Sequence, residues 1–264
     1  MKLSNNTPKI LYFDIETTIT VFAGFQLGKQ HVGHEQILKR PEVMCISWAW
    51  NDDKVKHATF DLSKYDLTKK DDDADYELLK MFSGEYSGAD LLVGQNSEWF
   101  DVPWLRSRII RHKLPPLPEV LHDDMYKQTQ KSVRHISHKL DDVGDFLGYG
   151  KKAEHGHGMD WWIRIALGDK KVLRDMAKYC DEDVAKLRKI YKHQLPYVKS
   201  KLNMSTFSGT ACCTQCGSTD VIKDGFARPG LAKYQRFRCN SCGHPFRGGE
   251  NLNKNTKQFS RDAG

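Results

Sequence analysis

Short apolar runs separated by polar turns dominate the first hundred residues. The run KILYFDI (9–15) is rich in aromatic and branched residues and ends in acids, which predicts a buried strand. VMCISWAW (43–50) and VKHATF (55–60), joined by the polar turn NDDK, predict a hairpin. LLVGQN (91–96) predicts another strand that runs into a loop. Together these segments predict a mixed sheet whose first strands are antiparallel.

Apolar residues at helical spacing alternate with these strands. A helix is expected within 73–86, and another begins at 104 and is stopped by the prolines of LPPLPEV. Residues 135–149 predict an amphipathic helix ended by glycines, and residues 170 to about 195 predict a long one. The alternation of strands and helices predicts an α/β layer fold.

The sequence changes character near residue 200, where Pro196 is followed by the polar stretch KSKLNMSTFSGT. We expect one large domain over residues 1–200 and a small module over residues 208–250, followed by a disordered tail at 251–264. The acidic run DDDAD at 71–75 is expected to be a solvated turn.

The positive charge is concentrated at the C-terminal end. The chain has 264 residues and a formal net charge of +7, and residues 210–264 hold nine Lys and Arg against four Asp and Glu. This end therefore carries most of the excess, which favours a polyanionic partner because Lys and Arg displace counterions from phosphates. A hydrophobic share of 39% and a mean hydropathy of −0.63 are typical of a globular protein rather than a disordered one.

Neither a membrane segment nor a secretory signal is visible in the sequence. No apolar run approaches the roughly 18 residues of a membrane span, and the N-terminal apolar segment is interrupted by an acid. We therefore expect a cytoplasmic protein with no membrane partner. If the protein is viral, the expected location is the cytoplasm of the host cell. Four of the seven cysteines fall into two close pairs and are then expected to bind metal rather than form disulfides, whereas Cys45 and Cys180 are expected to be ordinary core thiols.

Two carboxylates end the first predicted strand. The two-residue period of a strand turns Asp14 and Glu16 to one face and Ile15 to the other. One strand can thus offer two oxygen ligands to a hard cation, although such a pair alone is more often a solvated turn.

Two further patterns supply an aromatic residue and an acid each. Asn96, Phe100 and Asp101 form an Asn-x3-Phe-Asp pattern directly after the strand LLVG. Tyr179 and Asp183, at i and i+4, lie one turn apart on the same face of the predicted long helix. Each alone also suits a core aromatic or an exposed acid, but their occurrence in this order on these elements favours a site.

These motifs make the chain resemble the DEDD superfamily of 3′-to-5′ exonucleases, in particular the proofreading domains of family B DNA polymerases. The resemblance rests on FDIET (13–17), GQNSEWFDVPWL (94–105) and KYCDEDVAKL (178–187). SHKLDDVGDFLG (137–148) looks like the helix that precedes the third motif in that family. The resemblance covers roughly residues 8–195.

The resemblance implies a ribonuclease H-like mixed sheet flanked by helices, and a hydrolase that uses two Mg²⁺ or Mn²⁺ ions. Tyr179, four residues before the last acid, indicates the tyrosine subtype and would orient the attacking water. Four carboxylates would bind the two ions: Asp14, Glu16, Asp101 and Asp183. Three residues would contact the substrate or shape its loop: Thr17, Asn96 and Phe100.

Two features depart from the family pattern. Residues 18–42 separate the first two strands by more than a hairpin requires, and they suit either a substrate flap or, more simply, a surface excursion. A chain of 264 residues also has no room for a polymerase domain, which leaves proofreading only in trans.

Two Cys-x2-Cys-Gly knuckles lie in the C-terminal module. Cys213 with Cys216 and Cys239 with Cys242 have the spacing of paired ligands of one structural Zn²⁺, while Cys212 is expected to be a spectator. The basic and aromatic residues between and after the knuckles make the module resemble the zinc ribbons found near DNA-binding parts of transposases. The module is expected to hold DNA, and the alternative is that it docks on a replication or recombination protein.

The leading hypothesis is a 3′-to-5′ exonuclease that prefers single-stranded DNA ends. One alternative is a 3′-to-5′ exoribonuclease, because no motif in the sequence indicates whether the 2′-hydroxyl of RNA is recognised. The other is a non-catalytic nucleic-acid-binding or docking protein. Asp123 and Asp124, near a predicted strand end, are candidates for a supporting role. His155 and His157 are expected in a loop and not as ligands.

Overall fold

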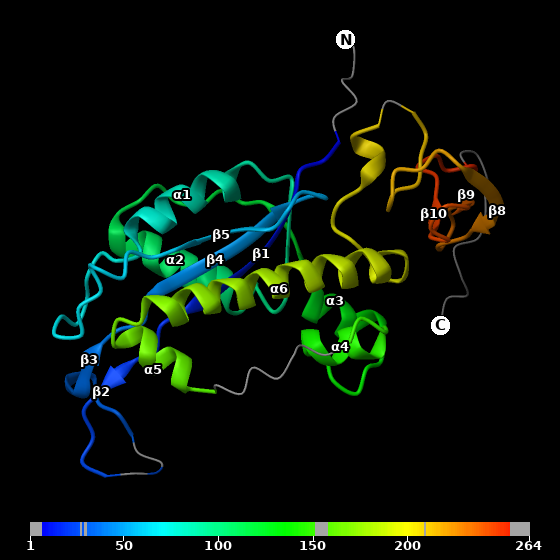
Figure 1. Ribbon diagram of the computed structural model, residues 1–264. Coiled ribbons are helices and arrows are strands. Elements are labelled where there is room, and N and C mark those ends of the chain that lie inside the picture. Colours follow the sequence, from blue (N-terminus) through cyan, green and yellow to red (C-terminus); the bar gives the residue numbers. More distant parts are fainter. Residues whose placement is uncertain (1–6, 27, 29–30, 151–157, 209, 254–264) are drawn as a thin grey trace, which may run out of the picture. The chain divides into compact units, whose positions relative to one another are not determined.

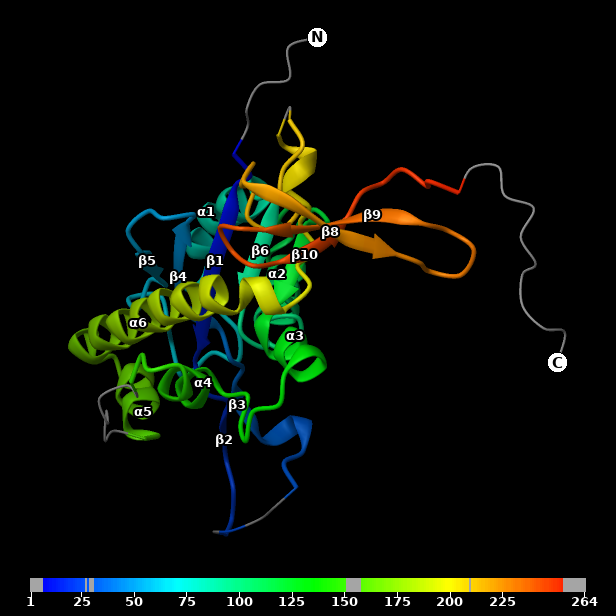
Figure 2. The same ribbon diagram turned by 90° about the vertical axis from the view of Figure 1, so that its right-hand side faces the viewer.

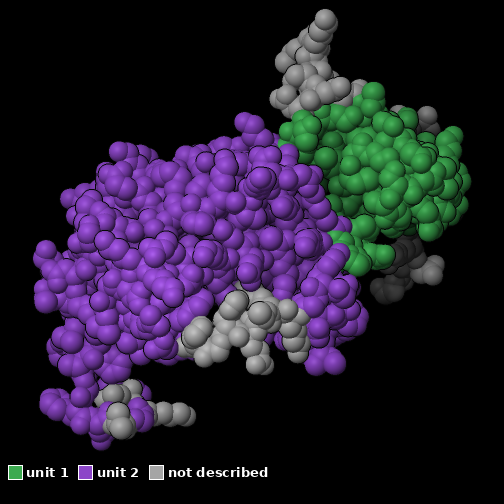
Figure 3. All heavy atoms as spheres, in the orientation of Figure 1, with its two compact units in different colours: residues 1–8, 193–264 green, residues 9–192 purple. Residues whose placement is uncertain are grey.

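The computed structural model forms two compact units, residues 9–192 and residues 1–8 with 193–264 (Figure 3). It describes residues 7–26, 28, 31–150, 158–208 and 210–253. The expectations for His155, His157 and most of the tail, residues 254–264, lie outside the described residues. Asn251 and Asn253, at the start of the expected tail, are hydrogen-bonded to Lys233 and Leu231.

A five-stranded mixed sheet forms the centre of the larger unit (Figure 1). Its strands lie in the order β5-β4-β1-β6-β7, with β1, β4 and β5 antiparallel and β1, β6 and β7 parallel. The strands are β1 (Ile10–Thr17), β4 (Val43–Trp50), β5 (Lys56–Thr59), β6 (Leu91–Gly94) and β7 (Leu121–Asp124). The predicted α/β class and the antiparallel start of the sheet are confirmed.

Helices flank this sheet on both faces (Figures 1 and 2). They are α1 (Tyr76–Ser87), α2 (Asp101–His112), α3 (Met125–Ser132), α4 (Leu140–Phe146), α5 (Asp160–Ala166) and α6 (Lys170–Gln194). The predicted long helix is confirmed as α6, and α2 ends before the prolines, at Lys113 in the left-handed conformation. No helix in the described part of the chain is both long and apolar enough to cross a membrane.

Alternate residues of β1 face different layers. Phe13 packs against Phe82 of α1, with ring centres 5.9 Å apart, whereas Tyr12 meets Tyr191 of α6 at 5.7 Å. Asp14 therefore shares the α6 side of the sheet with Tyr12. This alternation turns the acids of β1 toward the helix that carries the third motif.

The helix predicted over 135–149 is shorter than expected, because only α4 is helical there. The segment before α4 is hydrogen-bonded to residues outside it. The carbonyl of His138 accepts a hydrogen bond from Gln95 Nε2 at 2.7 Å, and its Nδ1 lies 3.0 Å from Thr129 Oγ1. These long-range contacts compete with helix formation and hold the segment near the end of β6.

The segment 18–42 is anchored at both ends. Strands β2 (Val21–Phe22) and β3 (Ile37–Lys39) pair antiparallel, and a short 3₁₀ turn (His34–Gln36) precedes β3. At its base, Thr18 N–H donates to the Glu42 carbonyl at 2.8 Å and Thr18 Oγ1 accepts from Glu42 N–H at 2.9 Å. The excursion thus starts and ends directly beside the last residue of β1.

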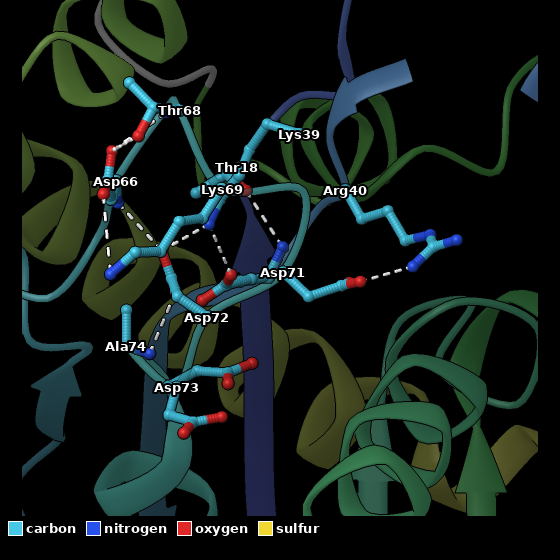
Figure 4. A network of polar contacts seen from close by, with 12 residues as sticks. Thr18, Lys39, Arg40, Asp66, Thr68, Lys69, Asp71, Asp72, Asp73 and Ala74 are labelled. Carbon is cyan, nitrogen blue, oxygen red and sulfur yellow. Dashed lines mark hydrogen bonds and ion pairs between the residues drawn. The ribbon is translucent and has the colours of Figure 1, made fainter. Parts of the chain in front are cut away.

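The acidic run 71–75 is not the solvated turn that we expected. Asp75 is fully buried, where it accepts two hydrogen bonds from Arg108, at 2.7 and 2.8 Å. Asp72 pairs with buried Lys39, whose Nζ also lies 3.0 Å from Glu42 Oε1 (Figure 4). Asp72 and Asp75 therefore point inward, because the buried cations Lys39 and Arg108 each require a partner of opposite charge.

The C-terminal unit contains a small antiparallel sheet of β10-β9-β8. Its strands are β8 (Val221–Ala227), β9 (Tyr234–Cys239) and β10 (Pro245–Arg247), and two 3₁₀ turns precede them, at Leu195–Tyr197 and Met204–Thr206. Between 221 and 253, only Cys239 is buried. The sheet therefore has almost no apolar core of its own.

Candidate functional site

Three of the predicted carboxylates converge on the α6 side of β1. Oxygen atoms of Asp14, Glu16 and Asp183 all lie within 4.8 Å of one another. The strand period presents the first two, and α6 supplies the third. All three are half-buried, so the cluster is open to solvent on one side.

The fourth carboxylate, Asp101, begins α2 and is 2% exposed. Its Oδ1 accepts a hydrogen bond from the backbone N–H of Ile15 at 3.0 Å, which ties it to the residue between Asp14 and Glu16. Burial, and next the charge of Asp14, raise the pKa of Asp101 well above its ordinary value. A buried acid beside other acids is unfavourable without a cation, which is the electrostatic situation of a metal site.

Tyr179 lies one helical turn before Asp183 on α6 and is half-buried. Its ring meets Trp161 of α5 edge-on, with centres 6.4 Å apart. The neighbouring Trp162 donates from Nε1 to the carbonyl of Thr17 at 3.1 Å. Helix α5 thus borders both the tyrosine and the end of β1, a role that sequence reasoning missed.

A set of polar contacts fixes α6 against the sheet beside the carboxylates. Asp181 accepts from Ser47 Oγ at 2.7 Å and lies 2.7 Å from His57 Nδ1, so it joins α6 to β4 and β5. Buried Cys180 lies 3.4 Å from Asp14 Oδ2, and burial raises the pKa of its thiol well above the ordinary value. The neutral thiol can therefore donate to the Asp14 carboxylate. As expected, Cys45 and Cys180 are core thiols.

The three predicted substrate residues lie at the end of β1 and in the segment between β6 and α2. Thr17 is the last residue of β1, and Phe100 is partly exposed with its ring 6.4 Å from Trp104. Asn96 is exposed and has a positive φ of 60°, so its backbone forms the turn after β6. The carbonyl of Asn96 accepts from the N–H of Trp99 and of Phe100, at 3.2 and 3.1 Å.

Asp124 holds this turn in place. Its Oδ1 accepts from the N–H of Asn96 at 3.1 Å and its Oδ2 from that of Glu98 at 3.0 Å. It also caps α3 through Tyr126 N–H at 3.0 Å. The sequence indicated a supporting role for one acid of this pair. The neighbouring Asp123 is also engaged, accepting from Tyr191 Oη at 2.9 Å.

The carboxylate cluster suits hard divalent cations. Mg²⁺ and Mn²⁺ prefer oxygen ligands, and Mg²⁺ keeps several waters, so it needs few protein groups. The cluster offers three carboxylates within ion-sharing distance and a buried fourth that has no compensating cation among the contacts described here. RNase H-like nucleases use divalent metals, and these residues fit such ions.

The four predicted knuckle cysteines also come together. Their sulfur atoms lie within 4.8 Å of one another, with Cys213 to Cys242 at 3.8 Å and Cys216 to Cys239 at 3.6 Å. A tetrahedron with Zn–S bonds of about 2.3 Å has edges of about 3.8 Å. The cluster therefore has the size of a Cys₄ zinc site.

Hydrogen bonds brace the first knuckle. Gln215 is buried and donates from Nε2 to the carbonyls of Leu195 and Val198, at 2.6 and 3.1 Å. Cys212 is buried beside the knuckle but is not part of the four-sulfur cluster. The described cluster thus consists of the four sulfurs that the spacing predicted.

Cations cover aromatic rings on the sheet of the C-terminal unit. Lys233 Nζ lies 4.1 Å from the ring centre of Phe226, and the Arg247 guanidinium lies 4.0 Å from that of Tyr234. Arg236 and Arg238 share a single acid, Asp224. Positive charge therefore exceeds negative charge on this exposed sheet.

Comparisons with known proteins identify the fold. The RNase H superfamily model matches residues 11–195. A solved structure, the family B DNA polymerase from the hyperthermophilic archaeon Pyrobaculum calidifontis, is similar with a TM-score of 0.51 and 19% identity. The match covers 72% of this chain and only 25% of the polymerase chain. No curated protein sequence matched significantly. Because the family model spans well over half of the residues, the chain belongs to the RNase H superfamily.

Proposed function

We propose that the protein is a 3′-to-5′ exonuclease that removes nucleotides from single-stranded DNA ends. The observation that carries the proposal is the convergence of Asp14, Glu16 and Asp183 next to buried Asp101. The 3′ polarity and the DNA substrate rest on the resemblance of the three motifs to proofreading domains.

The reaction is the hydrolysis of a phosphodiester. A water oxygen forms a bond to phosphorus, the bond from phosphorus to the 3′-oxygen breaks, and that oxygen leaves with a proton as the new 3′-hydroxyl. A nucleoside 5′-monophosphate is released. Two Mg²⁺ or Mn²⁺ ions held by the four carboxylates would make the water nucleophilic and stabilise the leaving oxygen.

The residues of the chain position the reactants. Asp14 would help to hold both ions, and its support is that it lies close to Glu16 and Asp183 and that its charge acts on Asp101. The phenol of Tyr179, one turn from Asp183, would hydrogen-bond the attacking water, and Trp161 restricts the ring from one side. Thr17 and the turn at Asn96 and Phe100 would place the terminal nucleotide.

The test is degradation of 3′- and 5′-labelled single-stranded DNA and RNA of equal sequence with Mg²⁺, Mn²⁺ or EDTA. We expect a metal-dependent ladder that shrinks from the 3′ end of DNA. Asp14→Ala and Asp183→Asn should abolish it, whereas Glu182→Gln, which changes an exposed acid next to Asp183, should retain it. Preferred cleavage of RNA would support the exoribonuclease, and no cleavage under any condition would leave a non-catalytic binding protein.

We further propose that the C-terminal unit is a zinc ribbon that holds nucleic acid. Its support is the Cys₄ cluster together with the exposed pairs Lys233–Phe226 and Arg247–Tyr234. Such pairs suit phosphates and bases of a single strand. Replacing Lys233 and Arg247 by Ala should weaken single-strand binding and lower its salt dependence by about 0.7 per lost phosphate contact. Unchanged binding would favour the alternative of docking on a replication or recombination protein.

A further inference from the structure

Trp99 presents a large aromatic ring to solvent beside the carboxylate site. It is 73% exposed, two residues before Asp101, which is 2% exposed. A single exposed apolar side chain is common on protein surfaces and is no site by itself. The surroundings of this ring, however, hold it ready for a ligand.

The backbone that carries Trp99 is fixed from several directions. Its own N–H donates to the Asn96 carbonyl at 3.2 Å, within the turn formed at the positive φ of Asn96. The preceding N–H, of Glu98, is held by buried Asp124 at 3.0 Å. The ring therefore projects from an ordered turn, so little backbone entropy is lost when a ligand binds.

A cation stands over the ring. Lys127 Nζ, from α3, lies 5.1 Å from the centre of the Trp99 ring and 2.5 Å from Glu98 Oε2. Lys127 and Glu98 are each partly exposed. A flat apolar surface with an ammonium group beside it matches the two parts of a nucleotide, the base and the phosphate.

The position in the sheet brings the turn that carries Trp99 close to the strand that carries two of the carboxylates. The turn follows β6, which is the parallel neighbour of β1, the strand that carries Asp14 and Glu16. Parallel neighbours lie about 4.8 Å apart and end at the same edge of a sheet. The turn after β6 also leads directly into Asp101.

We propose that Trp99 stacks on an unpaired nucleobase of the strand that enters the carboxylate site, and that Lys127 contacts a phosphate of the same strand. This inference rests on the proposed nuclease function and adds a substrate-binding group to it. Stacking accepts any base, which suits an enzyme that must pass along a strand of arbitrary sequence. An apolar side chain of a protein partner would use the ring but not the ammonium.

The test compares binding of short labelled oligomers to the full-length Asp183→Asn protein, with and without Trp99→Leu. Oligo-dT, oligo-U and an abasic DNA oligomer of equal length separate base from phosphate contacts and DNA from RNA. We expect Trp99→Leu to weaken binding to base-bearing oligomers by about 5- to 100-fold, with little effect on the abasic one. Trp99→Phe should restore most of the affinity, and Lys127→Ala should lower the salt slope by about 0.7.

Ile110→Ala, which removes a similarly exposed large apolar side chain (77%) from α2 of the same unit, is the control and should bind normally. Equal affinity of the Trp99→Leu and parent proteins for oligo-dT and oligo-U would overturn the inference, as would an equal loss with the abasic oligomer. In the active protein, Trp99→Leu should raise KM more than it lowers kcat. A parent protein that cleaves nothing would refute the nuclease proposal, while the binding measurement would still decide the role of Trp99.

Discussion

Removal of the Asp124 carboxylate is expected to destabilise the protein and to loosen the turn that leads into the site. The buried carboxylate accepts four backbone hydrogen bonds, from Asn96, Glu98, Tyr126 and Lys127. In Asp124→Ala, α3 loses its cap, which costs about 0.5 to 2 kcal/mol. The bonds to Asn96 and Glu98 reach across 28 and 26 residues, and charge-assisted bonds of this kind contribute about 1.5 to 3 kcal/mol each.

These contributions are not additive, so we expect a total loss of about 3 to 5 kcal/mol for Asp124→Ala. Asp124→Asn should lose less, because an amide oxygen at the Oδ1 position still accepts from Asn96 and Tyr126. Only the bond from Glu98 is then lost, since an amide nitrogen cannot accept it.

Urea unfolding gives the free energies, and amide hydrogen exchange at Asn96 and Glu98 reports on the turn itself. The matched control is Asp169→Ala. Asp169 accepts from Lys171 N–H and Val172 N–H at the start of α6, at 2.9 and 3.1 Å. Asp169 also pairs with Arg164 of the preceding helix. Asp169→Ala should lower the free energy of unfolding by less than Asp124→Ala does and leave exchange at Glu98 unchanged. A loss below about 1 kcal/mol in Asp124→Ala, or unchanged exchange at Glu98, would refute the reasoning.

Three other predictions follow from buried charges and ligands. Asp101→Asn should abolish nuclease activity yet raise the unfolding free energy of the metal-free protein by roughly 1 to 3 kcal/mol, measured by urea unfolding, because it removes a buried charge near other acids. Burial, and next the Asp72 carboxylate, raise the pKa of Glu42 from 4.5 to about 8. Stability should therefore fall as pH rises through this interval, by at most about 1.4 kcal/mol per pH unit, and Glu42→Gln should flatten that slope in urea titrations. Cys239→Ser should release zinc, measured by metal analysis, and unfold the C-terminal sheet, while the circular dichroism of α6 and its neighbours persists.

The regular periods of strands and helices explain why much of the candidate site could be predicted from the sequence. The period of two in β1 places Asp14 and Glu16 together, and the spacing of four in α6 places Tyr179 above Asp183. Both rules act within one element, so they hold without knowledge of the rest of the fold. The same is true of the knuckles, where two residues between cysteines set the local turn.

The features that could not be predicted depend on distant partners. The helix predicted over 135–149 is shortened because His138 bonds to Gln95 and contacts Thr129. Asp72 and Asp75 of the acidic run turn inward because Lys39 and Arg108 reach them from other elements, whereas Asp73 stays exposed. No periodicity encodes such pairings, since each depends on where two separate segments meet.

The exposure of Trp99 is another feature that could not be predicted from the sequence. Its sequence neighbours Phe100 and Asp101 were assigned roles through the family resemblance, which gives no role to Trp99. Only the fixed turn and the ammonium of Lys127 reveal that the ring faces solvent in an ordered position. Folded geometry was therefore necessary to recognise it.

The two candidate metal sites differ in their ligand atoms, which are oxygens in one and sulfurs in the other. Cys180 is a sulfur-bearing residue next to the oxygen site. A thiolate beside the carboxylates would attract zinc, which binds sulfur strongly, and would compete with Mg²⁺ or Mn²⁺. Cys180 lies 3.4 Å from Asp14 Oδ2, close enough to take part. Burial, together with Cys45 and Asp14, raises the pKa of its thiol, which favours a neutral thiol that donates to the Asp14 carboxylate. We therefore expect the carboxylates to bind hard cations and the four cysteines of the other unit to bind zinc.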